Sequence, residues 1–152
     1  MATKTDLSDV TFLIPVRIDS IDRIENLLAV VSYINKHFFT RFILLEASSY
    51  NNLILAKLLP KNVRVIFFED HDPVFIGLII INRLFEQAET PIVAVWDADV
   101  LVPKNQIEIA ANLIRNDEAQ FVLPYKERFL NTSMLVRELY FKSNKNFQLP
   151  KK

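Results

Sequence analysis

The sequence of 152 residues contains no cysteine and only one glycine, Gly77. Without cysteine, the chain forms no disulfide, has no thiol nucleophile and does not bind zinc through thiolates. The motifs GxGxxG and GxxxxGKS/T use several glycines to bring the backbone close to phosphate groups. A single glycine cannot build either motif, so a Rossmann dinucleotide site and a P-loop are excluded.

An excess of charge and long hydrophobic runs are also missing. Eighteen basic residues balance eighteen acidic ones, so the formal net charge is zero and no overall field attracts nucleic acid or an anionic membrane. The longest apolar runs, such as residues 75–81, are too short to span a bilayer, and the N-terminus has no signal-peptide core. We therefore expect a soluble, cytoplasmic protein that binds no nucleic acid and has no transmembrane segment.

Apolar runs and helical repeats alternate along the chain. Runs typical of buried strands lie at residues 10–16, 42–47, 63–68, 92–96 and 120–123. Segments with apolar residues at helical spacing separate these runs. Strands of continuous apolar residues separated by helices indicate a mostly parallel sheet that is covered on both faces. The predicted fold class is therefore α/β, with a three-layer αβα arrangement in which a mostly parallel sheet is the middle layer.

Composition and pattern together predict one main domain. With 51% hydrophobic and 24% charged residues, the chain can bury a core of its own. We expect an N-terminal tail over residues 1–9, an α/β domain over residues 10–125 and a C-terminal helical extension over residues 126–152.

Open sheets of this class bind ligands outside the carboxyl ends of their strands. The polar residues near those ends are Arg17, Asp19, Glu46, Asp70, Asp97 and Asp99. Glu46 follows an apolar run directly, and a part-buried lone carboxylate costs free energy unless something binds it. Asp19 has a simpler interpretation as a helix cap, and Arg17 as a surface partner of Asp19.

The strongest motif is the pair Asp97 and Asp99 within VAVWDADVLVP. Side chains at positions i and i+2 of an extended segment point the same way, so both carboxylates can bind one cation. Mg²⁺ and Mn²⁺ take such oxygen ligands and complete their shell with substrate phosphates. Capping of the next turn by both aspartates is the structural alternative. A haloacid-dehalogenase-like phosphatase fits less well, because Leu101 stands where that pattern has Thr or Val.

Several segments together resemble the GT-A fold glycosyltransferases of family 2 type, in particular their galactosyltransferase-like group. The segments are VTFLIPVRIDS at residues 10–20, WDADV at 96–100 and the P..QI pattern at 103–107. The resemblance covers residues 10–18, 42–47, 82 and 90–107, and more loosely 122–125. It implies the N-terminal, donor-binding half of a metal-dependent, inverting enzyme that transfers a hexose from a UDP-sugar, with residues 10–125 as the nucleotide-sugar-binding domain.

The resemblance also assigns roles to individual residues. The nucleotide-binding residues that it implies are Pro15, Val16, Arg17, Glu46, Asp70 and Asp97. Pro15, Val16 and Arg17 would form a turn at the uracil or ribose. Asp99, with Asp97, would hold the Mn²⁺ or Mg²⁺ ion that bridges the two phosphates, since a cation that neutralises the leaving diphosphate lowers the barrier to transfer.

Two features depart from the family pattern. Gly77 occupies a place where relatives carry a basic residue for the diphosphate, and the region that supplies the general base lies beyond the length of this chain. The chain is therefore either a fragment of a longer enzyme or a short donor-binding relic. A catalytically inactive binding or assembly module of the same fold is the alternative to an enzyme. The acceptor is not indicated by the sequence.

A half-domain should expose apolar surface that further strands would cover. The segment FVLPY at residues 121–125 and the aromatic residues Phe129, Tyr140 and Phe141 are the candidates. Such a surface predicts self-association into a homo-oligomer.

Overall fold

The computed structural model describes residues 3–72, 77–125 and 130–143. Its strands are β1 (Thr5–Val16), β2 (Phe38–Ser48), β3 (Val63–Glu69) and β4 (Ile92–Val95). They form a four-stranded sheet in the order β3-β2-β1-β4, and every neighbouring pair is parallel. The predicted α/β class with a parallel sheet is thereby confirmed.

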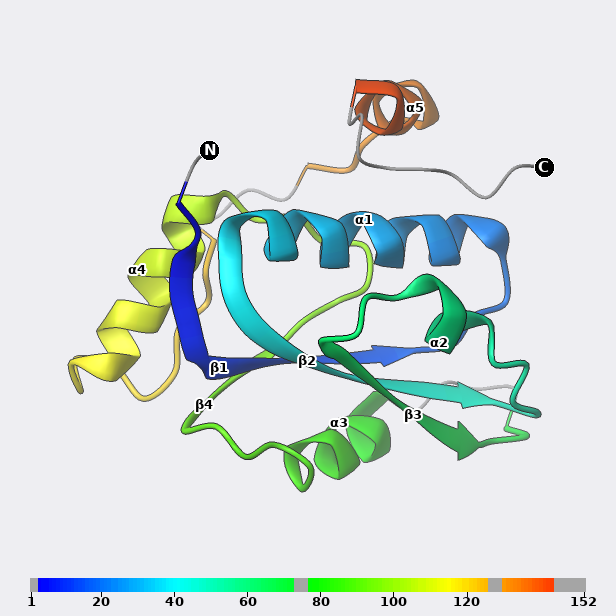
Figure 1. The fold of residues 1–152 in the computed structure, drawn as a ribbon, viewed down its shortest axis with the longest axis horizontal. Coiled ribbons are helices and arrows are strands. Elements are labelled where there is room, and N and C mark those ends of the chain that lie inside the picture. The colour runs from blue at the N-terminus through cyan, green and yellow to red at the C-terminus, as the bar shows by residue number, and fades with distance from the viewer. Residues whose placement is uncertain (1–2, 73–76, 126–129, 144–152) are drawn as a thin grey trace.

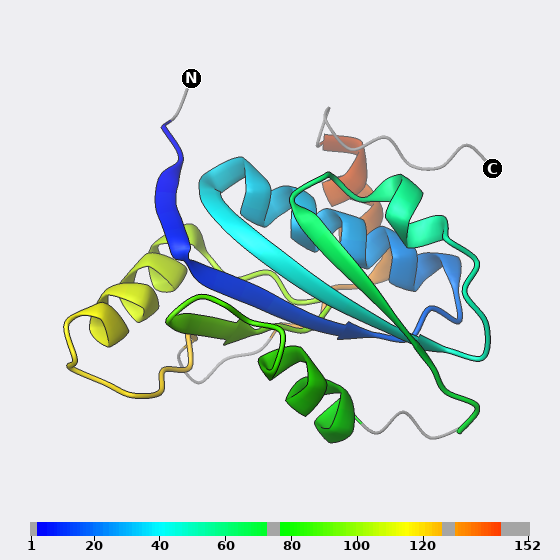
Figure 2. The ribbon, with the colours of Figure 1, turned by 60° about the horizontal axis from the view of Figure 1, so that its bottom comes forward.

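The helices are α1 (Ile21–His37), α2 (Ile54–Leu58), α3 (Gly77–Phe85), α4 (Lys104–Arg115) and α5 (Met134–Ser143). Figure 1 shows α1 above the sheet and α3 below it, and the turned view of Figure 2 keeps them on opposite faces. The sheet is therefore a middle layer between helices. None of the helices in the described part of the chain is both long and apolar enough to cross a lipid bilayer.

Alternation along the two central strands explains why the sheet is covered on both faces. Phe12 and Leu44 belong to the core cluster that includes the buried residues of α1, whereas Leu13 and Leu45 belong to the cluster with Ile80 of α3. Successive side chains of a strand point to opposite faces, so a strand that is apolar throughout supplies both clusters. This arrangement is the reason that the runs at 10–16 and 42–47 have no polar alternation.

The cap of helix α1 lies one residue after Asp19, which the sequence suggested for this role. Ser20 is its N-cap residue and accepts a hydrogen bond from the backbone N–H of Arg23 at 3.4 Å. Asp19 does not pair with Arg17, as the sequence suggested, but with Arg23 one turn along the helix, at 2.9 Å. The side chain of Arg17 pairs instead with Asp70.

Two strand predictions differ from the structure. β1 begins at Thr5, so residues 5–9, which the sequence assigned to a tail, form the start of the strand. Residues 120–123, predicted as a fifth strand, are irregular, and Phe121 is 77% exposed. Apolar content alone does not make a strand, because its backbone groups need a neighbouring strand to pair with.

Helix α2 has only five residues, because the segment before it forms a turn. The side chains of Asn51 and Asn52 accept hydrogen bonds from the backbone N–H groups of Leu53 and Ile54, at 3.0 and 2.9 Å. Asparagine side chains that bond the backbone two residues ahead favour a turn over a helix. Leu53 also has a left-handed conformation with φ of 59°, so the helix starts only at Ile54.

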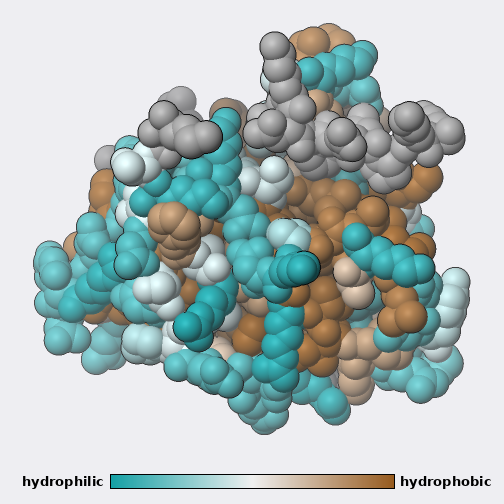
Figure 3. Space-filling model, in the orientation of Figure 1, coloured by the Kyte–Doolittle hydropathy of each residue, from teal (hydrophilic) through white to brown (hydrophobic). Residues whose placement is uncertain are grey.

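The expected apolar surface is exposed in part. Within the segment at residues 121–125, Phe121, Leu123 and Tyr125 are exposed. Phe141 is instead buried, and Phe129 lies outside the described residues. Figure 3 shows further apolar surface gathered over α2 and β3, where α2 is too short to cover the edge strand.

Phe141 is buried because Arg137 attaches α5 to α1. The guanidinium of Arg137 donates to the carboxylate of Glu25 at 2.6 Å and to the side chain of Asn26 at 2.9 Å, and it lies 4.6 Å from the ring centre of Phe141. Both charged side chains are largely buried, at 12% and 13% exposed. The ion pair is therefore poorly screened by water and holds the helix in place.

Arg137→Met should release α5 while preserving its helical propensity. The variant keeps an unbranched apolar stem but leaves Glu25 without its cation, at a cost of about 2 kcal/mol for a lost charged hydrogen bond. Amide hydrogen exchange over residues 134–143 should become faster, with the sheet unchanged. Arg23→Met, which removes the exposed ion pair between Arg23 and Asp19, is the control. Unchanged exchange in α5 would contradict this role of Arg137.

Candidate functional site

The order of the strands creates a switch point at the carboxyl edge of the sheet. From β1 the chain adds β2 and then β3 on one side, and it places β4 on the other side of β1. In open parallel sheets, ligands bind in the crevice outside the strand ends where the order reverses. The segments that meet there are those following β1 and β4, which carry Arg17 and the pair Asp97 and Asp99.

The fold brings the sequence-predicted residues to this one edge. Val16 of β1 is the pairing partner of Glu46 in β2, and Glu46 in turn pairs with Phe67 of β3. The ladder continues beyond β3, where the backbone N–H of Asp70 donates to the carbonyl of Ser48 at 2.9 Å. Across the edge, the predicted residues therefore follow the strand order, from Asp70 through Glu46 and Arg17 to Asp97.

Pro15 and Val16 differ from their predicted placement. Both lie inside β1 and pair with Leu45 and Glu46, so they do not form a turn with Arg17. The side chain of Val16 is buried in the core on the α1 face. Val16 is therefore a packing residue, and Arg17 is the first residue of this segment beyond the strand.

Arg17 joins two strands that are not neighbours. Its guanidinium forms an ion pair with Asp70, and it also donates to the backbone carbonyl of Asp72 at 2.6 Å. Since β2 lies between β1 and β3, this pair spans the carboxyl end of β2. The two side chains are only 17% and 18% exposed. The positive charge of Arg17 is therefore fixed at the edge and compensated by Asp70.

Glu46 is the most unusual residue of the edge. It is 2% exposed, and no hydrogen bond or ion pair joins its side chain to any other residue that the structure describes. Burial raises the pKa of its carboxyl group, because desolvation disfavours the charged form. No described side-chain oxygen is both sealed from solvent and without a partner, so the Glu46 oxygens still reach solvent. The carboxylate is thus an acceptor without a donor.

The WDADV segment is a turn fixed by its tryptophan. β4 ends at Val95, and the backbone N–H of Val100 donates to the carbonyl of Asp97 at 3.4 Å. The Trp96 ring packs edge-on against Phe12, with centres 5.2 Å apart, and its Nε1 donates to the carbonyl of Val100 at 3.0 Å. Trp96 therefore anchors both ends of the turn to the core.

This geometry corrects the reason given for the aspartate pair. The segment is not extended, so the rule that side chains at i and i+2 point the same way does not apply to it. Asp97 and Asp99 are both exposed. Sequence reasoning quoted Trp96 within the motif but missed its anchoring role, which the only tryptophan of the chain, next to two carboxylates, could have indicated.

The donor set at the turn determines how a cation would bind. No group of three or more acidic or histidine side chains suited to a metal ion occurs among the described residues. Two exposed carboxylates suit a Mg²⁺ or Mn²⁺ ion that arrives with phosphate oxygens, because such ions are often held by one or two carboxylates together with substrate. They do not suit a metal centre that the protein completes alone.

Fold and site together define an α/β protein with a parallel sheet and a polar carboxyl edge at its switch point. No protein-family model matches the chain, and no curated protein matches it in sequence. The geometry of the edge is therefore the basis for any functional assignment.

Proposed function

We propose that this chain binds the nucleoside diphosphate of a UDP-sugar, together with Mn²⁺ or Mg²⁺, as the donor-binding half of a GT-A glycosyltransferase. The observation that carries the proposal is the buried carboxylate of Glu46, which has no partner among the described residues and lies near the carboxyl end of β2, on the edge that Arg17 and the Asp97–Asp99 turn also reach. A ligand that donates hydrogen bonds to Glu46 relieves the cost of its burial.

Each residue of the edge has a distinct part in donor binding. Glu46 accepts a hydrogen bond from an N–H of the base or from a ribose hydroxyl. Arg17, which its ion pair with Asp70 fixes at the edge, places a positive charge beside the nucleoside. Asp97 and Asp99 would hold the cation, which would supply positive charge to offset that of the diphosphate leaving group.

Calorimetric titration of the purified chain with UDP tests the proposal. UDP should bind in the presence of Mn²⁺ and at least about tenfold more weakly after chelation, because the two carboxylates would otherwise repel the phosphates. Uridine, which has no phosphates, should bind weakly and without dependence on the metal. The absence of UDP binding at millimolar concentration with Mn²⁺ would overturn the proposal.

A catalytically inactive binding or assembly module is the second candidate. The observation that favours it is the exposed apolar surface on Leu53, Ile54 and Leu58 of the α2 region, which suits contact with another protein. A turnover assay separates the two candidates. Hydrolysis of a UDP-hexose, or transfer from it, by the purified chain would exclude the inactive module, whereas the absence of both turnover and metal-dependent UDP binding would support it.

A further inference from the structure

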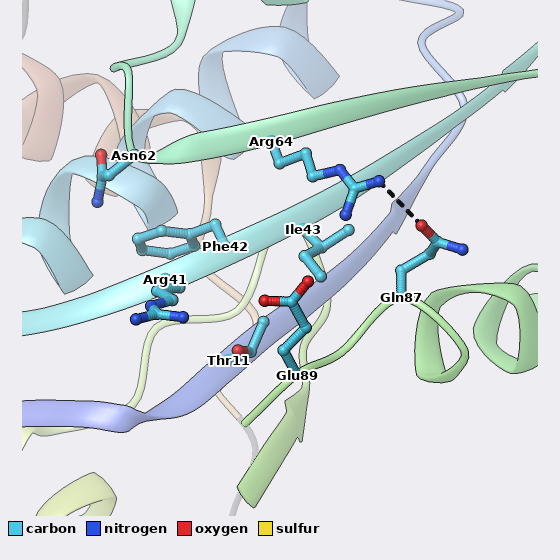
Figure 4. A pocket seen from close by; sticks show the side chains of 8 residues that line it. All are labelled: Thr11, Arg41, Phe42, Ile43, Asn62, Arg64, Gln87 and Glu89. Carbon is cyan, nitrogen blue, oxygen red and sulfur yellow. Dashed lines mark hydrogen bonds between the residues drawn. The ribbon is translucent and has the colours of Figure 1, made fainter. Parts of the chain in front are cut away.

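A pocket of about 280 Å³ lies at the opposite, amino end of the strands, on the α3 face of the sheet. Figure 4 shows the residues that line it: Thr11, Arg41, Phe42, Ile43, Asn62, Arg64, Gln87 and Glu89. The volume is slightly below the range of pockets that hold drug-sized ligands. The pocket therefore suits a ligand of few heavy atoms.

The strand register brings two arginines into this pocket. Arg41 is the pairing partner of Thr11, and Arg64 is the partner of Ile43, two residues further along β2. Ile43 belongs to the core cluster that faces α3, and residues two apart on a strand share a face. Arg41 and Arg64 thus stand on neighbouring strands and on the same side of the sheet, and both line the pocket.

The charged groups of the pocket do not neutralise one another. Arg64 donates to the side-chain oxygen of Gln87 at 2.9 Å, which positions its guanidinium and leaves other N–H groups available. No ion pair joins Arg41 or Arg64 to Glu89 among the described residues. In the view of Figure 4, the carboxylate of Glu89 lies between the two guanidinium groups. The pocket thus combines two separated cations with one anion.

We propose that this pocket binds a small zwitterion, with its phosphate or carboxylate group on Arg41 and Arg64 and its ammonium group on Glu89. Two guanidinium groups match the oxygens of either anion, and hydrogen bonds between charged groups are about twice as strong as neutral ones. The carboxylate of Glu89 would repel a simple anion but attracts a ligand that also carries a positive charge. The pocket lies at the end of the strands opposite to the proposed nucleotide site.

Nuclear magnetic resonance titration of the labelled chain with three probes tests this site. Phosphoethanolamine carries a phosphate and an ammonium, β-alanine carries a carboxylate and an ammonium, and inorganic phosphate has no ammonium. At least one of the two zwitterions should shift the amide signals of Thr11 and Arg64 and should bind at least about tenfold more tightly than inorganic phosphate. The tighter zwitterion identifies the anion.

Two variants and one control separate binding from folding. Arg41→Gln and Glu89→Gln should each weaken zwitterion binding at least about tenfold, because each removes one charged partner. Neither side chain has a hydrogen bond or ion pair to another described residue, so both variants should fold. Arg23→Gln, which changes an exposed arginine of α1, should leave the affinity unchanged. Absence of zwitterion binding, equal binding of inorganic phosphate, or full affinity in Glu89→Gln would overturn the proposal.

Discussion

Asp99→Ala should abolish the dependence of UDP binding on Mn²⁺. The structure offers two exposed carboxylates at the Asp97 turn, so loss of one leaves a cation with a single protein ligand. We expect affinity for UDP with Mn²⁺ to fall at least about tenfold, which corresponds to ~1.4 kcal/mol, to the level found after chelation. Titration calorimetry of wild type and variant, each with and without the metal, measures the effect.

The control for this variant is a carboxylate away from the edge. Glu86 is exposed at the end of α3, toward the amino end of the strands, so Glu86→Ala should retain metal-dependent binding. Asp99→Ala should also unfold at the wild-type temperature, since the turn is fixed by Trp96 and by backbone bonds rather than by the Asp99 side chain. Retained metal dependence in Asp99→Ala would remove the Asp97–Asp99 turn from the proposed site.

Glu46→Gln should stabilise the free protein at neutral pH and weaken its binding of UDP. The buried carboxylate has no partner among the described residues, and the neutral amide of nearly the same shape avoids the cost of burying a charge. We expect a gain of about 1–2 kcal/mol in the free energy of unfolding at pH 7, measured by denaturant titration. The amide replaces one acceptor oxygen with a donor, so UDP affinity should fall.

The stability difference between wild type and Glu46→Gln should depend on pH. Burial raises the pKa of Glu46 above its usual value of 4.5, so the folded state holds its proton more tightly than the unfolded state does. Wild-type stability is therefore highest relative to the variant below about pH 4.5, and the difference grows in favour of Glu46→Gln as the pH rises through the folded pKa. A variant that is no more stable than wild type at pH 7 would show that burial of the Glu46 carboxylate does not destabilise the folded protein.

Local patterns in the sequence determined the elements that later packed together. The apolar runs at 10–16, 42–47 and 63–68 correspond to strands because a parallel sheet covered on both faces needs continuous apolar residues. The cap of α1 was predicted to within one residue, since the sequence suggested Asp19 and the hydroxyl of the next residue, Ser20, accepts the backbone bond. The ends of the apolar runs also indicated the approximate ends of the strands, and therefore the approximate positions of Glu46 and Asp97.

Relations between distant residues were decided only by the tertiary structure. The ion pair of Arg17 with Asp70 depends on β1 and β3 flanking β2, and no local pattern specifies that order. The isolation of Glu46 is likewise a property of its surroundings. Residues 120–123 have the composition of a strand but pair with no neighbour. Periodicity therefore determined which segments form strands and helices, whereas strand pairing decided which side chains meet, because pairing joins residues far apart in the chain.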